Sequence, residues 1–119
     1  MVFRFQKFPV YKDVKKFIKD IYITTMEFPK NERFGLTSQL RNAAISIALN
    51  IAEGSDRGSD REFNRFLRIA IGSTNEAVAA LDISLENRYI RLNIYNSLMV
   101  QAQNIVKQLS SFSKKLRSP

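Results

Sequence analysis

The sequence predicts an all-α protein, an antiparallel up-down-up-down four-helix bundle formed by one domain over residues 1–119. Two observations predict this fold. Apolar residues recur at helical spacing in four separate segments. The chain also holds only 4 Gly and 3 Pro, too few for a turn-rich β protein. Because the connections between the segments are short, successive helices are expected to pack as antiparallel neighbours.

The first two helices are expected at residues 10–26 and 36–54. In the first, apolar residues repeat every three or four positions while lysines occupy another face, as in an amphipathic helix. The segment 27–35 carries Pro and Gly and marks a connection. Gly54 is placed to stop the second helix.

The third and fourth helices are expected at residues 60–87 and 94–116. Ser59 and Glu62 have the spacing of a capping box, in which the hydroxyl and the carboxylate satisfy orphan amide groups at a helix start. In the fourth helix, apolar residues step by alternating threes and fours, which predicts a regular, coiled-coil-like seam.

Three aromatic residues precede the first helix. We expect Phe3, Phe5 and Phe8 to cap one end of the core. In the alternative interpretation, these aromatics alternate with Arg4 and Lys7 to stack on nucleic-acid bases.

The helix at 36–54 is apolar around about two thirds of its circumference. One bundle of four cannot cover such a helix fully, so we infer a homo-oligomer that uses helices 36–54 and 60–87. Facing positions of this hairpin should sum to about 113, which places Arg41 one turn from Glu76 and predicts a pair between them. The alternative is a monomer in which this helix is central and covered.

The chain contains no His and no Cys, which removes the commonest general base, the usual nucleophile pairs and the usual zinc ligands. Glu53 and Glu76 are the obvious carboxylates, but the same arithmetic separates them by more than ~20 Å. We therefore predict no enzyme, no catalytic residue, no metal and no cofactor. A carboxylate metal site across a subunit interface stays as the third hypothesis.

The formal net charge of +8 is unevenly distributed. Residues 35–92 hold seven basic and seven acidic residues, whereas residues 93–119 hold four basic residues and no acid. Such an excess predicts a surface that meets a polyanion, and the alternative is a surface that only keeps the protein soluble. The candidate nucleic-acid-binding residues are Lys12, Lys15, Lys16, Lys19, Arg57, Arg61, Arg65, Arg68, Lys107, Lys114, Lys115 and Arg117.

No apolar run is long enough to span a membrane, and the N-terminus lacks the apolar stretch of a signal peptide. The absence of Cys rules out a disulfide framework. These observations predict a cytoplasmic protein that does not bind a membrane.

A set of motif residues, densest over residues 28–76, is similar to a known family. The residues are Phe28-Pro29, the run Glu32 to Arg41, Asn50-Ile51-Ala52-Glu53-Gly54, Ser59, Glu62-Phe63, Phe66-Leu67, Ile69-Ala70, Gly72-Ser73 and Glu76. The chain resembles the bacterial four-helix-bundle family whose founding members are encoded in intervening sequences of 23S ribosomal RNA genes. It also looks similar to the accessory variability protein of diversity-generating retroelements.

The resemblance implies a homo-oligomer, specifically a pentamer, with a basic surface that binds nucleic acid. It also implies structural positions at helix or subunit contacts, which are Arg41, Asn50, Glu53, Ser73 and Glu76. The leading functional hypothesis is therefore a non-enzymatic oligomer that binds RNA, with DNA as the other nucleic acid. The alternative is a protein scaffold or accessory subunit that binds a partner such as a polymerase.

Overall fold

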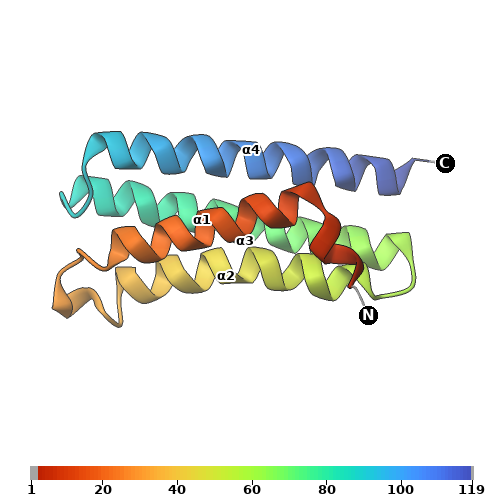
Figure 1. Cartoon of the computed structure of the whole chain (residues 1–119), viewed down its shortest axis with the longest axis horizontal. Coiled ribbons are helices and arrows are strands. Elements are labelled where there is room, and N and C mark those ends of the chain that lie inside the picture. The colour runs from red at the N-terminus through yellow and green to blue at the C-terminus, as the bar shows by residue number, and fades with distance from the viewer. Residues whose placement is uncertain (1–2, 119) are drawn as a thin grey trace.

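The computed structural model describes residues 3–118, so Met1, Val2 and Pro119 lie outside the described residues. The helices follow the order α1 (Pro9–Thr25), α2 (Leu36–Ser55), α3 (Asp60–Glu86) and α4 (Leu92–Arg117). They lie side by side in a bundle measuring 47 × 26 × 19 Å (Figure 1). Short 3₁₀ helices at Arg4–Lys7 and Lys30–Glu32 precede α1 and α2.

Successive helices run antiparallel, and α1 closes the bundle by packing against both α2 and α4 (Figure 1). This arrangement confirms the all-α up-down-up-down bundle. The predicted helix boundaries agree with the observed ones to within two residues.

The core is continuous from one end of the bundle to the other and takes apolar side chains from all four helices. Each large apolar side chain removed from water stabilises the fold by about 1.5–3 kcal/mol. The largest fully buried apolar side chains are Phe17, Ile21, Leu40, Ile47, Ile51, Leu67, Leu81, Leu98, Ile105 and Leu109.

Gly54 allows α2 and α3 to approach closely. A Cβ atom at this position would lie 2.6 Å from the Cβ of Phe66 and 3.0 Å from Cδ1 of Phe63. The prediction that Gly54 stops the helix is wrong, because α2 continues to Ser55 and Gly54 is buried inside it. The left-handed backbone position of the turn belongs instead to Gly58, with φ of 81°.

The start of α3 has only half of the predicted capping box. The Ser59 hydroxyl accepts a hydrogen bond from the Glu62 amide at 3.1 Å, as expected. The Glu62 carboxylate, however, pairs with Arg65 at 3.2 Å. Arg65 lies one turn along the exposed helix face, and its guanidinium donates to both oxygens of the Glu62 carboxylate, at 3.2 and 3.3 Å.

Arg41 holds the C-terminal end of α1. Its Nε donates to the Thr25 hydroxyl at 2.9 Å, its Nη2 donates to the Tyr22 carbonyl at 3.5 Å, and its guanidinium lies 4.4 Å from the Tyr22 ring centroid. The last carbonyls of a helix have no partner within the helix, so a cation there is favourable.

The predicted Arg41–Glu76 pair does not form in the chain. The hydrogen bond between the Ser46 and Ser73 hydroxyls, 2.8 Å long, shows that facing positions sum to about 119 rather than 113. This register still brings Arg41 close to the level of Glu76. The pair fails because Arg41 turns toward α1, whereas Glu76 lies on the exposed face of α3.

Glu32 connects the two loops at the end of the bundle away from the chain termini. Its Oε1 accepts from the Leu36 amide at 3.1 Å and so caps α2, and its Oε2 accepts from the Tyr89 hydroxyl at 3.0 Å. This hydrogen bond raises the pKa of Tyr89. A Cβ at Gly35 would meet the end of the Glu32 side chain, so a larger residue there would require the carboxylate to shift.

The N-terminal aromatics divide between two environments. Phe8 packs on Phe63 and Phe112, with ring centroids 6.1 and 5.1 Å away, and so caps the core as predicted. Phe5 is half-buried, but Phe3 remains 56% exposed. The capping prediction is therefore wrong for Phe3, which has only Phe5 as an aromatic neighbour.

Within residues 3–118, every helix is too short or too polar to cross a membrane.

The close approach at Gly54 gives a stability prediction. Gly54→Ala should lower the free energy of unfolding by roughly 1–3 kcal/mol, because the Phe66 contact leaves no room for a methyl group. The free energy of unfolding is measured by urea denaturation, with circular dichroism as the signal. Gly72→Ala is the matched control, since a Cβ there meets nothing within 4 Å, and it should leave stability unchanged or raise it by up to about 1 kcal/mol. Equal losses in the two variants would contradict the packing role of Gly54.

Candidate nucleic-acid interface

Three segments that are distant in the sequence meet at one end of the bundle. They are the N-terminal segment before α1, the α2–α3 turn with the end of α2 and the start of α3, and the end of α4 (Figure 1). Residues 3–8, 53–68 and 114–118 together hold nine Lys or Arg and four Asp or Glu, a net +5 of the chain's +8. We call these three segments the basic end.

The predicted arginines of α3 lie on its exposed face. Arg61, Arg65 and Arg68 are all exposed, as the helical spacing predicts. Arg65 is engaged by Glu62, and Arg57 is paired with Glu53 one turn before it. Among residues 3–118, Arg61 and Arg68 have no ion-pair partner, so their guanidinium groups are free to bind phosphate.

Phe66 holds two of the arginines together. The guanidinium carbons of Arg57 and Arg65 lie 4.9 and 4.5 Å from the Phe66 ring centroid, within the range of cation–π attraction. The hydrogen bond from Arg65 lowers the pKa of Glu62, which is therefore ionised at neutral pH. The contact of Phe66 with the arginines could not be predicted from helical spacing, which places Phe66 among the core residues of α3.

The C-terminal turn of α4 adds Lys114, Lys115 and Arg117 to the basic end. No acidic residue occurs anywhere in α4. Cations in a last turn also interact favourably with the partial negative charge of the helix C-terminus. The predicted arginine cluster and these C-terminal cations, about 50 residues apart in sequence, thus belong to one surface.

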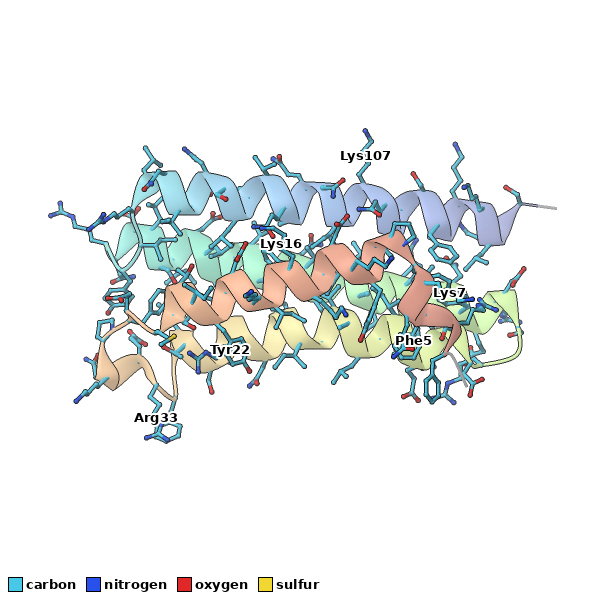
Figure 2. All side chains as sticks on the ribbon, viewed as in Figure 1. Phe5, Lys7, Lys16, Tyr22, Arg33 and Lys107 are labelled. Atoms are coloured by element: carbon cyan, nitrogen blue, oxygen red, sulfur yellow. The ribbon has the colours of Figure 1, made fainter. Side chains whose placement is uncertain are left out.

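The predicted lysines of α1 form a second, weaker basic surface. Lys12, Lys15, Lys16 and Lys19 are exposed along α1, and Lys107 is exposed on α4, the neighbouring helix (Figure 2). Carboxylates lie between them. Asp13 accepts from Gln108 at 2.7 Å and from Asn104 at 3.2 Å. This surface therefore carries a smaller excess of charge than the basic end.

Asp20 is the second carboxylate between α1 and α4. It accepts from Gln101 and from Lys16, both at 2.9 Å. Burial raises the pKa of Asp20, but the hydrogen bonds from Lys16 and Gln101 outweigh burial and hold the pKa below its ordinary value. Asp20 therefore stays ionised at neutral pH and neutralises part of the α1 lysine row.

Comparison with known protein families identifies the family of this chain. The family described as 23S rRNA-intervening sequence protein matches residues 6–111. The chain belongs to this family. None of the curated proteins matches the chain.

A solved structure supports the assignment of the chain to the 23S rRNA-intervening sequence protein family. The chain is similar to a protein of unknown function of the S23 ribosomal protein family from Bacteroides thetaiotaomicron, whose crystal structure was determined at 1.70 Å resolution. The TM-score is 0.79 at 26% sequence identity, over 88% of this chain and 98% of the other. The resemblance to the family of 23S rRNA intervening sequences, inferred from the motif residues, is confirmed.

Among the motif residues expected at helix or subunit contacts, Arg41 and Ser73 bond to a neighbouring helix and Asn50 supports one of these bonds. Asn50 donates to the Ser46 carbonyl at 2.8 Å, and Ser46 bonds the Ser73 hydroxyl of α3, so Asn50 and Ser73 belong to one polar chain between the helices. Glu53 is exposed and pairs with Arg57, and Glu76 is exposed without an ion pair among residues 3–118.

The residues of this family member that the structure describes contain no cluster of three carboxylates suited to a metal ion.

Asp20 gives a pH-dependent prediction. Asp20→Asn should lower the free energy of unfolding at neutral pH, by at most about 1 kcal/mol for so exposed a pair. Because its folded-state pKa is depressed, the stabilisation exists above the unfolded-state pKa and disappears as pH falls through the folded-state pKa. Urea denaturation of both proteins across the acid range should show the two curves converging. Glu27→Gln, at an exposed carboxyl after α1, is the control, and a constant gap for Asp20→Asn would contradict the assignment.

Proposed function

We propose that this member of the 23S rRNA-intervening sequence protein family is a non-enzymatic, homo-oligomeric protein that binds RNA through its basic end. The observation that carries the proposal is the convergence of three distant segments, with a net charge of +5, on one end of the bundle. Phosphate contacts dominate the affinity of proteins for nucleic acid, and clustered arginines suit them because the guanidinium fork offers paired donors. We choose RNA as the polyanion from the association of the family with 23S rRNA intervening sequences, and DNA is the other nucleic acid to be tested.

The oligomer is proposed from the outer face of the α2–α3 hairpin. Leu49 is 62% exposed on α2 and Ile69 is 41% exposed on α3, on either side of the Asn50–Ser46–Ser73 hydrogen bonds. Large apolar side chains that remain exposed on an apolar helix favour association with a second subunit, because association removes them from water. By analogy with the family, we propose a pentamer.

A protein scaffold is the second candidate function. It is favoured by two apolar side chains near the α1–α2 connection, at the end opposite the basic end. Phe34 is 87% exposed and Met26 is 75% exposed. Exposed aromatic and Met side chains are enriched at protein interfaces. Co-purification with a partner protein that survives nuclease treatment would favour this function over RNA binding.

The basic end gives a salt-dependence prediction. The affinity for an RNA stem should fall linearly with salt on logarithmic axes, and Arg61→Ala/Arg68→Ala/Lys114→Ala should reduce the slope by about 2–3, close to one unit per lost phosphate contact. Fluorescence anisotropy at several salt concentrations measures the slope.

The charge-matched control is Lys12→Ala/Lys19→Ala/Lys107→Ala, which removes the same charge from the α1–α4 surface and should change the slope by less than about 1. Equal effects of the two triple variants would contradict the location of the site. No binding of the unmodified protein at low salt would overturn the function.

The apolar outer face gives an assembly prediction. Leu49→Glu should dissociate the oligomer, because it places a carboxylate among apolar contacts at the proposed interface. Native mass spectrometry, run with and without nuclease, measures the subunit number. The control is Val100→Glu, since Val100 is 65% exposed on α4 and should tolerate a charge. The proposed interface would be contradicted if the unmodified protein were a monomer, or if Leu49→Glu formed an oligomer with the same number of subunits.

A further inference from the structure

A cavity of about 770 Å³ opens between the N-terminal segment and the end of α2. Residues from the N-terminal segment line one side of it, and residues from the α2 end and the following turn line the other. The lining residues used below are Phe3, Arg4, Phe5, Glu53, Asp56 and Arg57. Its volume lies within the range of small-ligand sites, and it belongs to the basic end.

The N-terminal wall of the cavity is held in place by the core. Phe8 stacks between α3 and α4, and Phe5 makes an edge-to-face contact with Tyr11 of α1 at 5.0 Å. Phe3 lies 5.9 Å from Phe5 and is 56% exposed. The wall therefore offers an anchored aromatic pair whose outer member is open to a flat ligand.

Arg4 supplies fixed cationic donors at the same place. Its guanidinium carbon lies 5.6 Å from the Phe8 ring centroid and 5.3 Å from that of Phe63. Within residues 3–118 it has neither a hydrogen-bond acceptor nor an ion-pair partner. Arg4 also lines a neighbouring cavity of about 560 Å³, which shares Asp56 with the first. Aromatic contacts thus position a guanidinium whose N–H donors are unused.

The α2 side of the cavity supplies acceptors. Glu53 is paired with Arg57, but Asp56 has no ion-pair partner among the described residues. A carboxylate accepts hydrogen bonds from the exocyclic amino groups of bases. An apolar ligand would leave the Arg4 donors and the Asp56 acceptors without partners. A nucleotide offers a partner to each side chain: an aromatic face for Phe3, a phosphate for Arg4 and N–H donors for Asp56.

We propose that this cavity binds one unpaired nucleotide of the bound RNA. Phe3 stacks on the base, Arg4 binds the phosphate, and Asp56 accepts from the edge of the base. This inference rests on the proposed RNA-binding function and adds to it a preference for an unpaired nucleotide beside the phosphate contacts of the basic end. It also assigns Phe3, which the core does not require, to a ligand.

The test compares a fluorescently labelled single-stranded oligocytidylate, whose bases carry an exocyclic amino group, with an RNA hairpin of equal length whose paired strands are joined by a non-nucleotide linker. Both are measured at several salt concentrations, beginning with a low one. Phe3→Ala should weaken single-strand binding by roughly 5- to 150-fold, the range for loss of one base–aromatic stack. Its affinity for the hairpin should change by less than about twofold, and its salt slope should be unchanged because stacking releases no counterions. Phe3→Tyr, which keeps the ring, should bind the single strand as the unmodified protein does.

Phe34→Ala is the matched control, because Phe34 is the exposed aromatic at the opposite end and should affect neither RNA. Melting curves that match the unmodified protein show that each variant is folded. If the hairpin binds but Phe3→Ala and Phe34→Ala bind the single strand equally, the cavity inference is overturned while the proposed function stands. If neither RNA binds the unmodified protein, both are overturned.

Discussion

The contact between Gly54 and Phe66 is the constraint on which the rest of the structure depends. Because Gly54 has no side chain where α2 meets α3, the two helices approach each other until the Ser46 and Ser73 hydroxyls form a direct hydrogen bond. The same contact fixes the turn that follows, because Phe66 also receives Arg57 and Arg65 on its ring. One close packing point therefore sets the register of the hairpin and the position of the first arginines of the basic end.

The two ends of the bundle differ in charge and in the contacts that hold their connections. At one end, Glu32 joins both loops by hydrogen bonds to Leu36 and Tyr89, and the positive excess is small. At the other end, the connections are short and exposed, and most of the chain's net charge collects there. Exposed arginines without carboxylate partners add little to stability, since surface ion pairs contribute at most about 1 kcal/mol even when formed. Their concentration at one end is the observation on which the proposed binding of RNA rests.

The polar residues along the helices also separate by role. Ser46 and Ser73 join α2 to α3, and Asn50 supports Ser46 from within α2. Asp13 and Asp20 join α1 to the amide side chains of α4. These carboxylates reduce the charge of the α1 lysine row, although the row is conspicuous in the sequence. A run of like charges along a helix thus indicates exposure, and its value as a binding surface depends on what the neighbouring helix places beside it.

The sequence by itself determined the four helices and their core stripes, because helical periodicity and short connections are local properties of the chain. It also determined that Arg61, Arg65 and Arg68 share an exposed face. Only the tertiary structure decided that Gly54 is a packing residue, that Arg41 caps α1 rather than pairing with Glu76, and that Phe3 and Arg4 line a cavity with Asp56. These contacts join segments from different helices, so their distances depend on rotation and register, which no local pattern specifies.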